Sequence, residues 1–469
     1  MRKKWILLSA TYALLMPLVA SAVEKPKNII FIIADGMGSA YTTAYRGYMD
    51  NPATIKVETT VFDHLLVGMA STHSRGTQKN HTDNTYVTDS AASATALSTG
   101  VKTYNQAVAV DINDQPLQTI MEYAKSLGKK TGLVVTSQIN HATPASFVAH
   151  NTYRYNYNAI ADDYYDNRVN GQFVADLMFG GGKKYFIRKD RDIVSQFKQS
   201  GYHYADQWDQ LDRIKQLPVL GLFAKKGIGY AIDNQVKHQP AYRLHKMVKK
   251  AMSLLQGSDK SSDKGYFLLI EASMIDWCGH ANDIACAMHE VNDLARVVSY
   301  VKEQIDNGDD TLMVMTADHN TGGLSVGTVG EYRWKPSAVK QIRHSIDKTI
   351  DDVLKNKDME TLWRKNMAIS ISSAKLARLD KVQKQAIKLI DKAKGSDSET
   401  RKTAQDNAEQ LISDELVALT SQLTLTGWTS SNHTGGDVQV FAHGTGKERF
   451  NGHLDNTDIG KQLFKLTKQ

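Results

Sequence analysis

Residues 28–38 read Asn-Ile-Ile-Phe-Ile-Ile-Ala-Asp-Gly-Met-Gly, and this segment indicates the fold class. An almost wholly apolar run ends abruptly at Asp35, which is typical of a strand buried on both faces of a parallel sheet. In open α/β sheets, ligands bind beyond the carboxyl ends of the strands. We therefore expect Asp35 to belong to a binding site at that edge.

The same pattern of a short apolar run followed by polar residues recurs at 131–136, 266–271 and 311–316. Helical patterns lie at 115–128, 243–256 and 285–306. This alternation predicts an α/β fold in three αβα layers, with a mostly parallel central sheet. The polar residues that end or follow the three runs are 137–143, Glu271 and Asp318-His319. Together with Asp35, they place metal-binding residue types at one edge of the sheet.

Residues 1–22 have the form of a secretory signal peptide. Arg2, Lys3 and Lys4 precede an apolar stretch at 5–20, and Ala20-Ser21-Ala22 gives a small-x-small cleavage site. A membrane anchor is the alternative, but this stretch is short for a bilayer span. We expect residues 23–469 to form one domain that is periplasmic or secreted, with no membrane anchor after cleavage.

Charge and composition exclude some partners. Loss of the three basic residues of the signal would lower the formal net charge from +7 to +4, which does not indicate a nucleic-acid-binding protein. Residues 330–428 lack clear buried strands and contain two amphipathic helical patterns, 372–395 and 398–421. We interpret 330–428 as a mainly helical insertion, which could form a homodimer contact, an active-site rim or surface decoration.

The two cysteines, Cys278 and Cys286, are either joined or free. A continuous helix would separate them by about 12 Å, too far for a bridge. A disulfide therefore requires a helix that begins after Cys278, and the sequence leaves both states open.

The segment around Ser90 predicts a phosphate site. Small residues that favour a helix follow Ser90, Gly100 can end that helix, and Thr88 or Asp89 is a suitable N-cap. Free backbone N–H groups and the helix dipole at such an end attract an anion. The alternative is that Ser90 only caps a tightly packed, alanine-rich helix.

A serine hydroxyl needs a base or a metal to become a nucleophile. No nucleophile elbow surrounds Ser90, whereas metal-ligand types are abundant. Asp276 and His280 lie four residues apart, and His433 lies in a glycine-rich loop. Nitrogen with carboxylate oxygen suits Zn²⁺, and an all-oxygen set suits Mg²⁺.

Taken together, these segments resemble the alkaline phosphatases, which hydrolyse phosphate monoesters with two zinc ions and one magnesium ion. The matching segments, in the family's order, are 33–38, 88–103, 142–145, 180–182, 271–280, 316–319 and 433–435. The resemblance implies that Ser90 becomes phosphorylated, that Arg154 grips the phosphoryl oxygens of a phosphate monoester or of inorganic phosphate, and that Asp89 orients Arg154.

The resemblance also implies the metal ligands. Asp318 and His319 would bind the zinc beside Ser90, with Asp35 shared between this zinc and the magnesium. Thr143 and Glu271 would complete the magnesium set. The ligands implied for the other zinc are Asp276, His280 and His433.

Two positions depart from the family's pattern. His141 stands where some relatives carry Asp, and Trp277 stands where some carry Lys. His141 either supplies nitrogen to the third metal or only hydrogen-bonds a water there, so the identity of the third ion stays open.

Three other functions agree less well with these residues. A sulfatase would need a Cys/Ser-x-Pro-x-Arg segment, which the residues after Ser90 do not supply. A phosphodiesterase remains open as a side activity, although Arg154 favours several free phosphoryl oxygens. A phosphate- or metal-binding protein without turnover would not explain a serine beside so many metal ligands.

Overall fold

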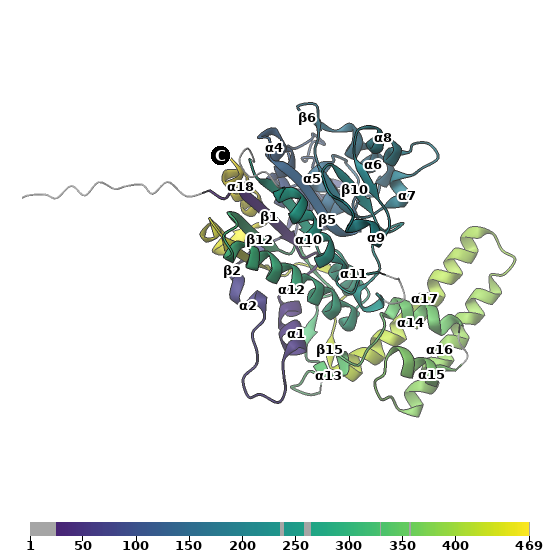
Figure 1. Ribbon diagram of the computed structural model, residues 1–469. Coiled ribbons are helices and arrows are strands. Elements are labelled where there is room, and N and C mark those ends of the chain that lie inside the picture. Colours follow the sequence, from purple (N-terminus) through teal and green to yellow (C-terminus); the bar gives the residue numbers. More distant parts are fainter. Residues whose placement is uncertain (1–24, 235–238, 258–263, 329, 356–357, 469) are drawn as a thin grey trace, which may run out of the picture.

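The computed structural model describes residues 25–234, 239–257, 264–328, 330–355 and 358–468. The predicted signal peptide therefore lies outside the described residues. A ten-stranded sheet forms the centre of the molecule (Figure 1). In spatial order its strands are β18 (Gly452–Asp455), β2 (Leu66–Ser71), β17 (Val438–Gly444), β12 (Thr311–Thr316), β1 (Asn28–Ile33), β11 (Tyr266–Glu271), β5 (Lys130–Gln138), β8 (Leu177–Gly181), β10 (Val219–Leu222) and β9 (His203–Ala205).

The four apolar runs are neighbouring parallel strands, β12-β1-β11-β5, as the α/β prediction requires. In register, Ile33 lies opposite Thr316 on one side and Glu271 on the other, so these strands end level with one another. Only β17 pairs antiparallel, with β12 and with β2, among the described pairs of this sheet. The polar residues after each parallel strand are thereby brought to one edge.

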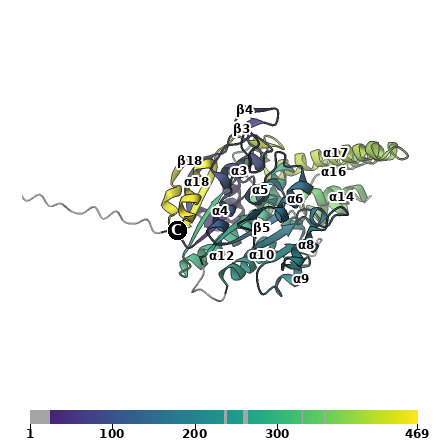
Figure 2. The same ribbon diagram turned by 90° about the horizontal axis from the view of Figure 1, so that it is seen from above.

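Helices cover both faces of the sheet (Figure 2). One layer holds α1 (Ser39–Met49), α2 (Val61–Leu65), α10 (Arg243–Gln256) and α12 (Ile284–Asp306). The other holds α3 (Ser90–Thr99), α4 (Ile120–Ser126), α5 (Ala142–Val148) and α18 (Asn456–Thr467). Helix α4 starts later than the predicted 115–128, because Thr119 and Glu122 form a capping box at its N-terminus.

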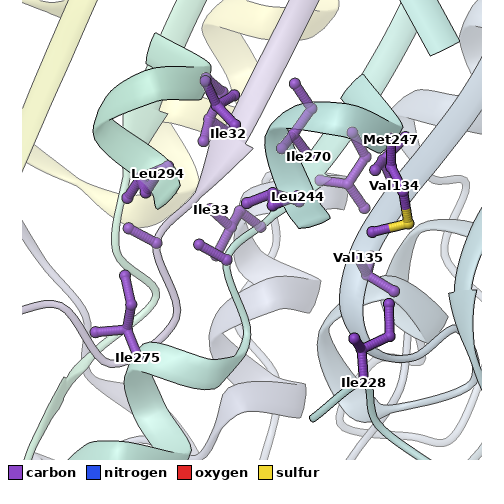
Figure 3. Packing of buried hydrophobic residues seen from close by; sticks show 14 of the residues in the cluster. Ile32, Ile33, Val134, Val135, Ile228, Leu244, Met247, Ile270, Ile275 and Leu294 are labelled. Atoms are coloured by element: carbon purple, nitrogen blue, oxygen red, sulfur yellow. The ribbon is translucent and has the colours of Figure 1, made fainter. Parts of the chain in front are cut away.

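The core lies between the sheet and these layers. Every residue of β1 and β11 is buried, as a strand covered on both faces requires. Figure 3 shows Ile33 and Ile270 of the sheet close to Leu244 of α10 and Leu294 of α12. Full burial of one such side chain contributes about 1.5–3 kcal/mol to folding.

The remaining elements surround this body. Near the β9 edge lie α6 (Tyr157–Asp166), α7 (Lys183–Phe186), α8 (Ile193–Gln199) and α9 (Trp208–Leu211). The two-stranded pairs are β3 (Ser74–Thr77) with β4 (Asn80–Thr85), β6 (Arg168–Val169) with β7 (Gln172–Phe173), β13 (Asn320–Thr321) with β16 (His433–Thr434), and β14 (Ser325–Val326) with β15 (Thr426–Gly427). Helix α11 (Met274–His280) and the 3₁₀ turns η1 (Ala231–Asp233) and η2 (Lys447–Phe450) complete the set.

The described residues of 330–428 form five helices: α13 (Pro336–Val339), α14 (Ile346–Lys355), α15 (Met359–Asn366), α16 (Ser373–Lys392) and α17 (Ser398–Thr424). Helices α16 and α17 form a hairpin that extends away from the body (Figures 1 and 2). Helix α16 buries little beyond Leu379, Gln383 and Ala386. Helix α17 buries more, and its buried residues run from Ala408 to Thr424, toward its C-terminus. No helix in the described ranges is both long and apolar enough to cross a membrane.

Cys278 and Cys286 form a disulfide, with their Cα atoms 5.5 Å apart. This is possible because the helix is interrupted: Cys278 belongs to α11, whereas Cys286 belongs to α12. Asp283 lies in the break, where its Oδ1 accepts from the backbone N–H of Cys286 at 3.0 Å. Its Oδ2 accepts from the N–H of Ile346 at 2.7 Å, so one carboxylate joins α12 to the first turn of α14.

Candidate active site

Three groups of side chains at the carboxyl edge of the sheet have metal-ligand geometry, each with its candidate ligand atoms within 4.8 Å of one another. We call them the first metal group (Asp276, His280, His433), the second metal group (Asp35, Asp318, His319) and the third metal group (Asp35, His141, Glu271). The three groups contain eight of the residues that the sequence analysis singled out. Ser90, which contacts His319 of the second group, is the ninth.

The turn after β1 allows this close approach. Gly36 has φ +72°, a left-handed conformation that glycine adopts without strain. A Cβ at this position would lie 2.8 Å from the Cα of Asp276 and 2.7 Å from Oγ1 of Thr321. Asp35 can therefore sit against the other ligand-bearing segments only because glycine follows it.

The first metal group presents three lone pairs to one point. His280 and His433 each donate from Nδ1 to a backbone carbonyl, those of Ser431 at 2.6 Å and Thr88 at 2.9 Å. A neutral imidazole carries one N–H, so both Nε2 atoms present lone pairs. These atoms lie 3.2 Å apart, and Asp276 Oδ1 lies 3.4 and 3.6 Å from them. Ligands of a tetrahedral zinc at about 2.0–2.1 Å are about 3.3 Å apart, so this group fits zinc.

The second metal group lies beside Ser90. The backbone N–H groups of Gly36 and His319 donate to Asp318 Oδ1 at 3.1 and 3.0 Å, which leaves Oδ2 without a hydrogen-bond partner. His319 Nε2 is 3.2 Å from that Oδ2, 3.5 Å from Asp35 Oδ1 and 3.0 Å from Ser90 Oγ. Nitrogen, two carboxylates and a hydroxyl thus converge, again a zinc-type set.

Thr321, which the sequence did not single out, links the first two groups. Its hydroxyl donates to Asp276 Oδ1 at 2.5 Å and lies 3.1 Å from His319 Nδ1. A hydroxyl has one hydrogen, so Thr321 accepts from Nδ1 and leaves the Nε2 of His319 free for a cation. The only sequence signal for this role is the position of Thr321 soon after the strand-end pair Asp318-His319.

Ser90 and Arg154 form the anion-binding part. Ser90 is the first residue of α3 and is buried. Asp89 caps this helix through Oδ1, which accepts from the N–H of Ala92 at 3.0 Å and of Gln106 at 2.9 Å. Its Oδ2 accepts from Arg154 Nη1 at 2.8 Å. Burial opposes the charge, but Arg154 and these N–H groups still lower the pKa of Asp89, so it stays ionised.

The third metal group is rich in unpaired oxygen. Both carboxylate oxygens of Asp35 and Oε1 of Glu271 are buried without a hydrogen-bond partner. The same holds for Oγ1 of Thr143, in the first turn of α5. Burial, with the nearby carboxylates, raises the pKa of Asp35, and burial raises that of Glu271 to about 8. A hard cation such as Mg²⁺ suits this oxygen set.

His141 belongs to the third group by distance, yet it contacts Arg154. Arg154 Nη2 lies 3.4 Å from His141 Nε2, and a guanidinium only donates, so Nε2 accepts and Nδ1 carries the hydrogen. Burial and the Arg154 charge lower the pKa of His141 to about 3, so the ring is neutral. This tautomer suits donation to a water or a carboxylate better than direct binding of a cation.

Trp277 is no ligand. Its ring lies edge-on to His141, with the centroids 5.8 Å apart, and packs against Gly227. It also lines a cavity of about 430 Å³ whose other walls include Lys348 of α14 and Glu409 of α17. Trp277 is therefore a point where α14 and α17 approach the metal groups.

Comparisons with known proteins cover nearly the whole chain. Residues 26–469 match the family described as alkaline phosphatase. Alkaline phosphatase 3 of Bacillus subtilis is 41% identical over 454 residues, which cover 95% of this chain and 91% of that protein. The crystal structure of a cold-active alkaline phosphatase from a psychrophilic Shewanella species has a TM-score of 0.82 at 42% identity, covering 94% of this chain and 100% of that one. The alkaline phosphatase of Thermus thermophilus, 24% identical with a TM-score of 0.76, shares the fold and covers 94% of this chain and 91% of that one.

Removal of the Thr321 hydroxyl should weaken metal binding. In Thr321→Val, Asp276 and His319 each lose the partner that orients them, and we expect zinc affinity to fall about 10–100-fold. Competition with a chromophoric chelator measures this affinity. Thr321→Ser keeps the hydroxyl and should retain near-normal affinity; equal zinc affinity in the Val variant and the parent would show that Thr321 does not orient the ligands.

Proposed function

Because this chain belongs to the alkaline phosphatase family and is a metal-dependent phosphomonoesterase, we propose that Ser90 is its nucleophile. The observation that carries the proposal is the contact of 3.0 Å between Ser90 Oγ and His319 Nε2, at the N-terminus of α3. It puts a buried hydroxyl beside a metal-type group and beside free helix N–H groups, where a phosphoryl group is stabilised.

We propose the following path for the reaction. Ser90 Oγ attacks phosphorus, the ester P–O bond breaks, and the alcohol leaves with a proton. Water then attacks the phosphoserine, which frees Ser90 and releases inorganic phosphate. When bound, two zinc ions in the first and second groups and one magnesium ion in the third would supply Lewis-acid activation of the attacking and leaving oxygens.

Arg154 is proposed to hold the phosphoryl group. Asp89 fixes its Nη1, whereas its Nε is buried without a partner. Nη2 carries two hydrogens, one of which is donated to His141 Nε2. The Nε hydrogen and the second Nη2 hydrogen therefore remain for two phosphoryl oxygens, the bidentate mode that a guanidinium favours. A monoester has three nonbridging oxygens, so one remains to face the metal groups when Arg154 holds two. A diester has only two, which supports monoesters as the preferred substrates.

Ser90→Ala should lower kcat by at least about a thousandfold, because the phosphoserine cannot form. Its zinc content should not change, since Asp35, Asp318 and His319 still offer three ligand atoms beside the lost hydroxyl. Acid quenching with labelled phosphate, followed by peptide mapping, should mark Ser90 in the parent and in Ser93→Ala. Label on another residue, or normal turnover by Ser90→Ala, would refute the assignment.

The assignment of magnesium to the third metal group rests on its oxygen ligands Asp35, Thr143 and Glu271. We propose that His141 donates a hydrogen bond there and does not bind the ion, because its contact with Arg154 leaves the hydrogen on Nδ1. The alternative is that the imidazole binds zinc directly and makes the site prone to zinc inhibition.

Substitution of His141 separates these alternatives. His141→Asn keeps a donor but no imidazole, and its inhibition by excess zinc at fixed magnesium should match that of the parent. His141→Asp adds a carboxylate and should lower the magnesium needed for half-maximal activity by about tenfold. His64→Asp, at an exposed position of α2, is the control. Resistance of His141→Asn to zinc would instead identify His141 as a zinc ligand.

Location and assembly are also proposed. The form of residues 1–22 and the disulfide of Cys278 and Cys286 support export to the periplasm or the medium, where disulfides persist. N-terminal sequencing of the mature protein would then begin at Val23. The largely exposed α16–α17 hairpin supports a homodimer contact. Light scattering would give a monomer mass for the native protein if this second proposal is wrong.

A further inference from the structure

Four tyrosines form a continuous series of ring contacts beside Arg154. The ring centroids of Tyr153 and Tyr155 are 5.3 Å apart, those of Tyr155 and Tyr157 are 6.0 Å apart, and those of Tyr157 and Tyr185 are 5.0 Å apart. These are the distances and tilts of favourable aromatic pairs. We call this series the tyrosine ladder (Tyr153, Tyr155, Tyr157, Tyr185).

The backbone that carries the ladder is held in place. The N–H of Arg154 donates to the carbonyl of Gln106 at 2.9 Å, and the N–H of Asn156 closes a turn onto the carbonyl of Tyr153 at 3.0 Å. The side-chain amide of Asn140 donates to the carbonyl of Tyr157 at 2.8 Å. The rings are therefore positioned before any ligand arrives, which lowers the entropic cost of using them.

The ladder runs from the interior to the surface. Tyr185 is 8% exposed, whereas Tyr153 is 38% and Tyr155 51% exposed. The Arg154 guanidinium carbon lies 5.5 Å from the centroid of the Tyr155 ring. An exposed aromatic ring thus adjoins the residue proposed to hold the phosphoryl group, at a distance that the rest of a bound ester could reach.

The segment before Ser90 also exposes large side chains. Tyr86 is 78% and Val87 40% exposed, and both precede the segment of Ser90. A Cβ on Gly435 would lie 2.7 Å from the Tyr86 carbonyl oxygen and 3.7 Å from Val87 Cγ2, which places this pair next to the His433 loop. Large exposed side chains therefore also lie beside the His433 loop, although the phosphoryl group itself needs only charge.

We propose that Tyr155, supported by Tyr153, binds the planar aromatic part of a phosphate monoester and makes the enzyme prefer aromatic over aliphatic leaving groups. An aromatic ring can stack on these rings, and an aliphatic alcohol of similar size gains less from the contact. The inference rests on the proposed position of the phosphoryl group at Ser90 and Arg154. A ring joined directly to phosphate and a nucleobase joined through a sugar share this chemistry.

Binding of nonhydrolysable phosphonates tests the proposal without the chemical step. The readout is the ratio of the inhibition constants of methylphosphonate and phenylphosphonate, which measures the benefit of the ring. We expect this ratio to fall about three- to tenfold in Tyr155→Ala. Tyr155→Phe keeps the ring and should keep the ratio, as should Tyr332→Ala, which removes a tyrosine exposed elsewhere. An unchanged ratio in Tyr155→Ala would overturn the proposal.

Two further measurements show which class of aromatic ester uses Tyr155 and whether Arg154 holds the phosphoryl group. Comparison of kcat/KM for phenyl phosphate and adenosine monophosphate, each relative to glycerol phosphate, shows which ester loses more in Tyr155→Ala; loss for neither overturns the proposal. Arg154→Ala should weaken inhibition by methylphosphonate itself. Unchanged inhibition by methylphosphonate in Arg154→Ala would show that Arg154 does not hold the phosphoryl group. This outcome is distinct from a change in the ratio of the two phosphonate inhibition constants.

Discussion

Buried carboxylates repel one another at the carboxyl end of the central sheet, and the site is built around this repulsion. Asp35 contributes to two of the metal groups, and both of its oxygens lack a hydrogen-bond partner in the interior. Burial and the neighbouring carboxylates raise its pKa, and burial raises that of Glu271 to about 8. Bound cations would offset the repulsion between these buried carboxylates. Protons would compete with the cations for the carboxylates as the pH falls through the pKa of Glu271, about 8.

The repulsion is tolerated because rigid elements hold the ligands from outside. Level ends of neighbouring parallel strands fix Asp35 and Glu271, and Gly36 lets the first turn approach α11. Backbone carbonyls set the tautomers of His280 and His433, and Thr321 sets that of His319. Ser90, the proposed nucleophile, lies on α3. The anion-binding part meets the metal groups through the contact of Ser90 with His319 and the contact of Arg154 with His141.

The sequence predicted the parts of this arrangement that are local. The apolar runs before Asp35 and Asp318 gave the parallel strands, and the small residues after Ser90 gave α3 with Gly100 at its end. Contacts between residues far apart in the chain could not be predicted from the sequence. The disulfide depends on a helix break at Asp283 that also receives the N–H of Ile346, 63 residues further along the chain. Thr321 and the tyrosine ladder acquire their roles only from neighbours that the fold supplies.

Anomalous X-ray diffraction from crystals grown with zinc and magnesium tests the central claim most directly. Data from both sides of the zinc absorption edge should show two strong peaks about 4 Å apart, one within each of the first and second metal groups. The third group should give density without a zinc signal. Absence of zinc between His280 and His433, or zinc bound only at histidines away from the sheet edge, would contradict this account of the site.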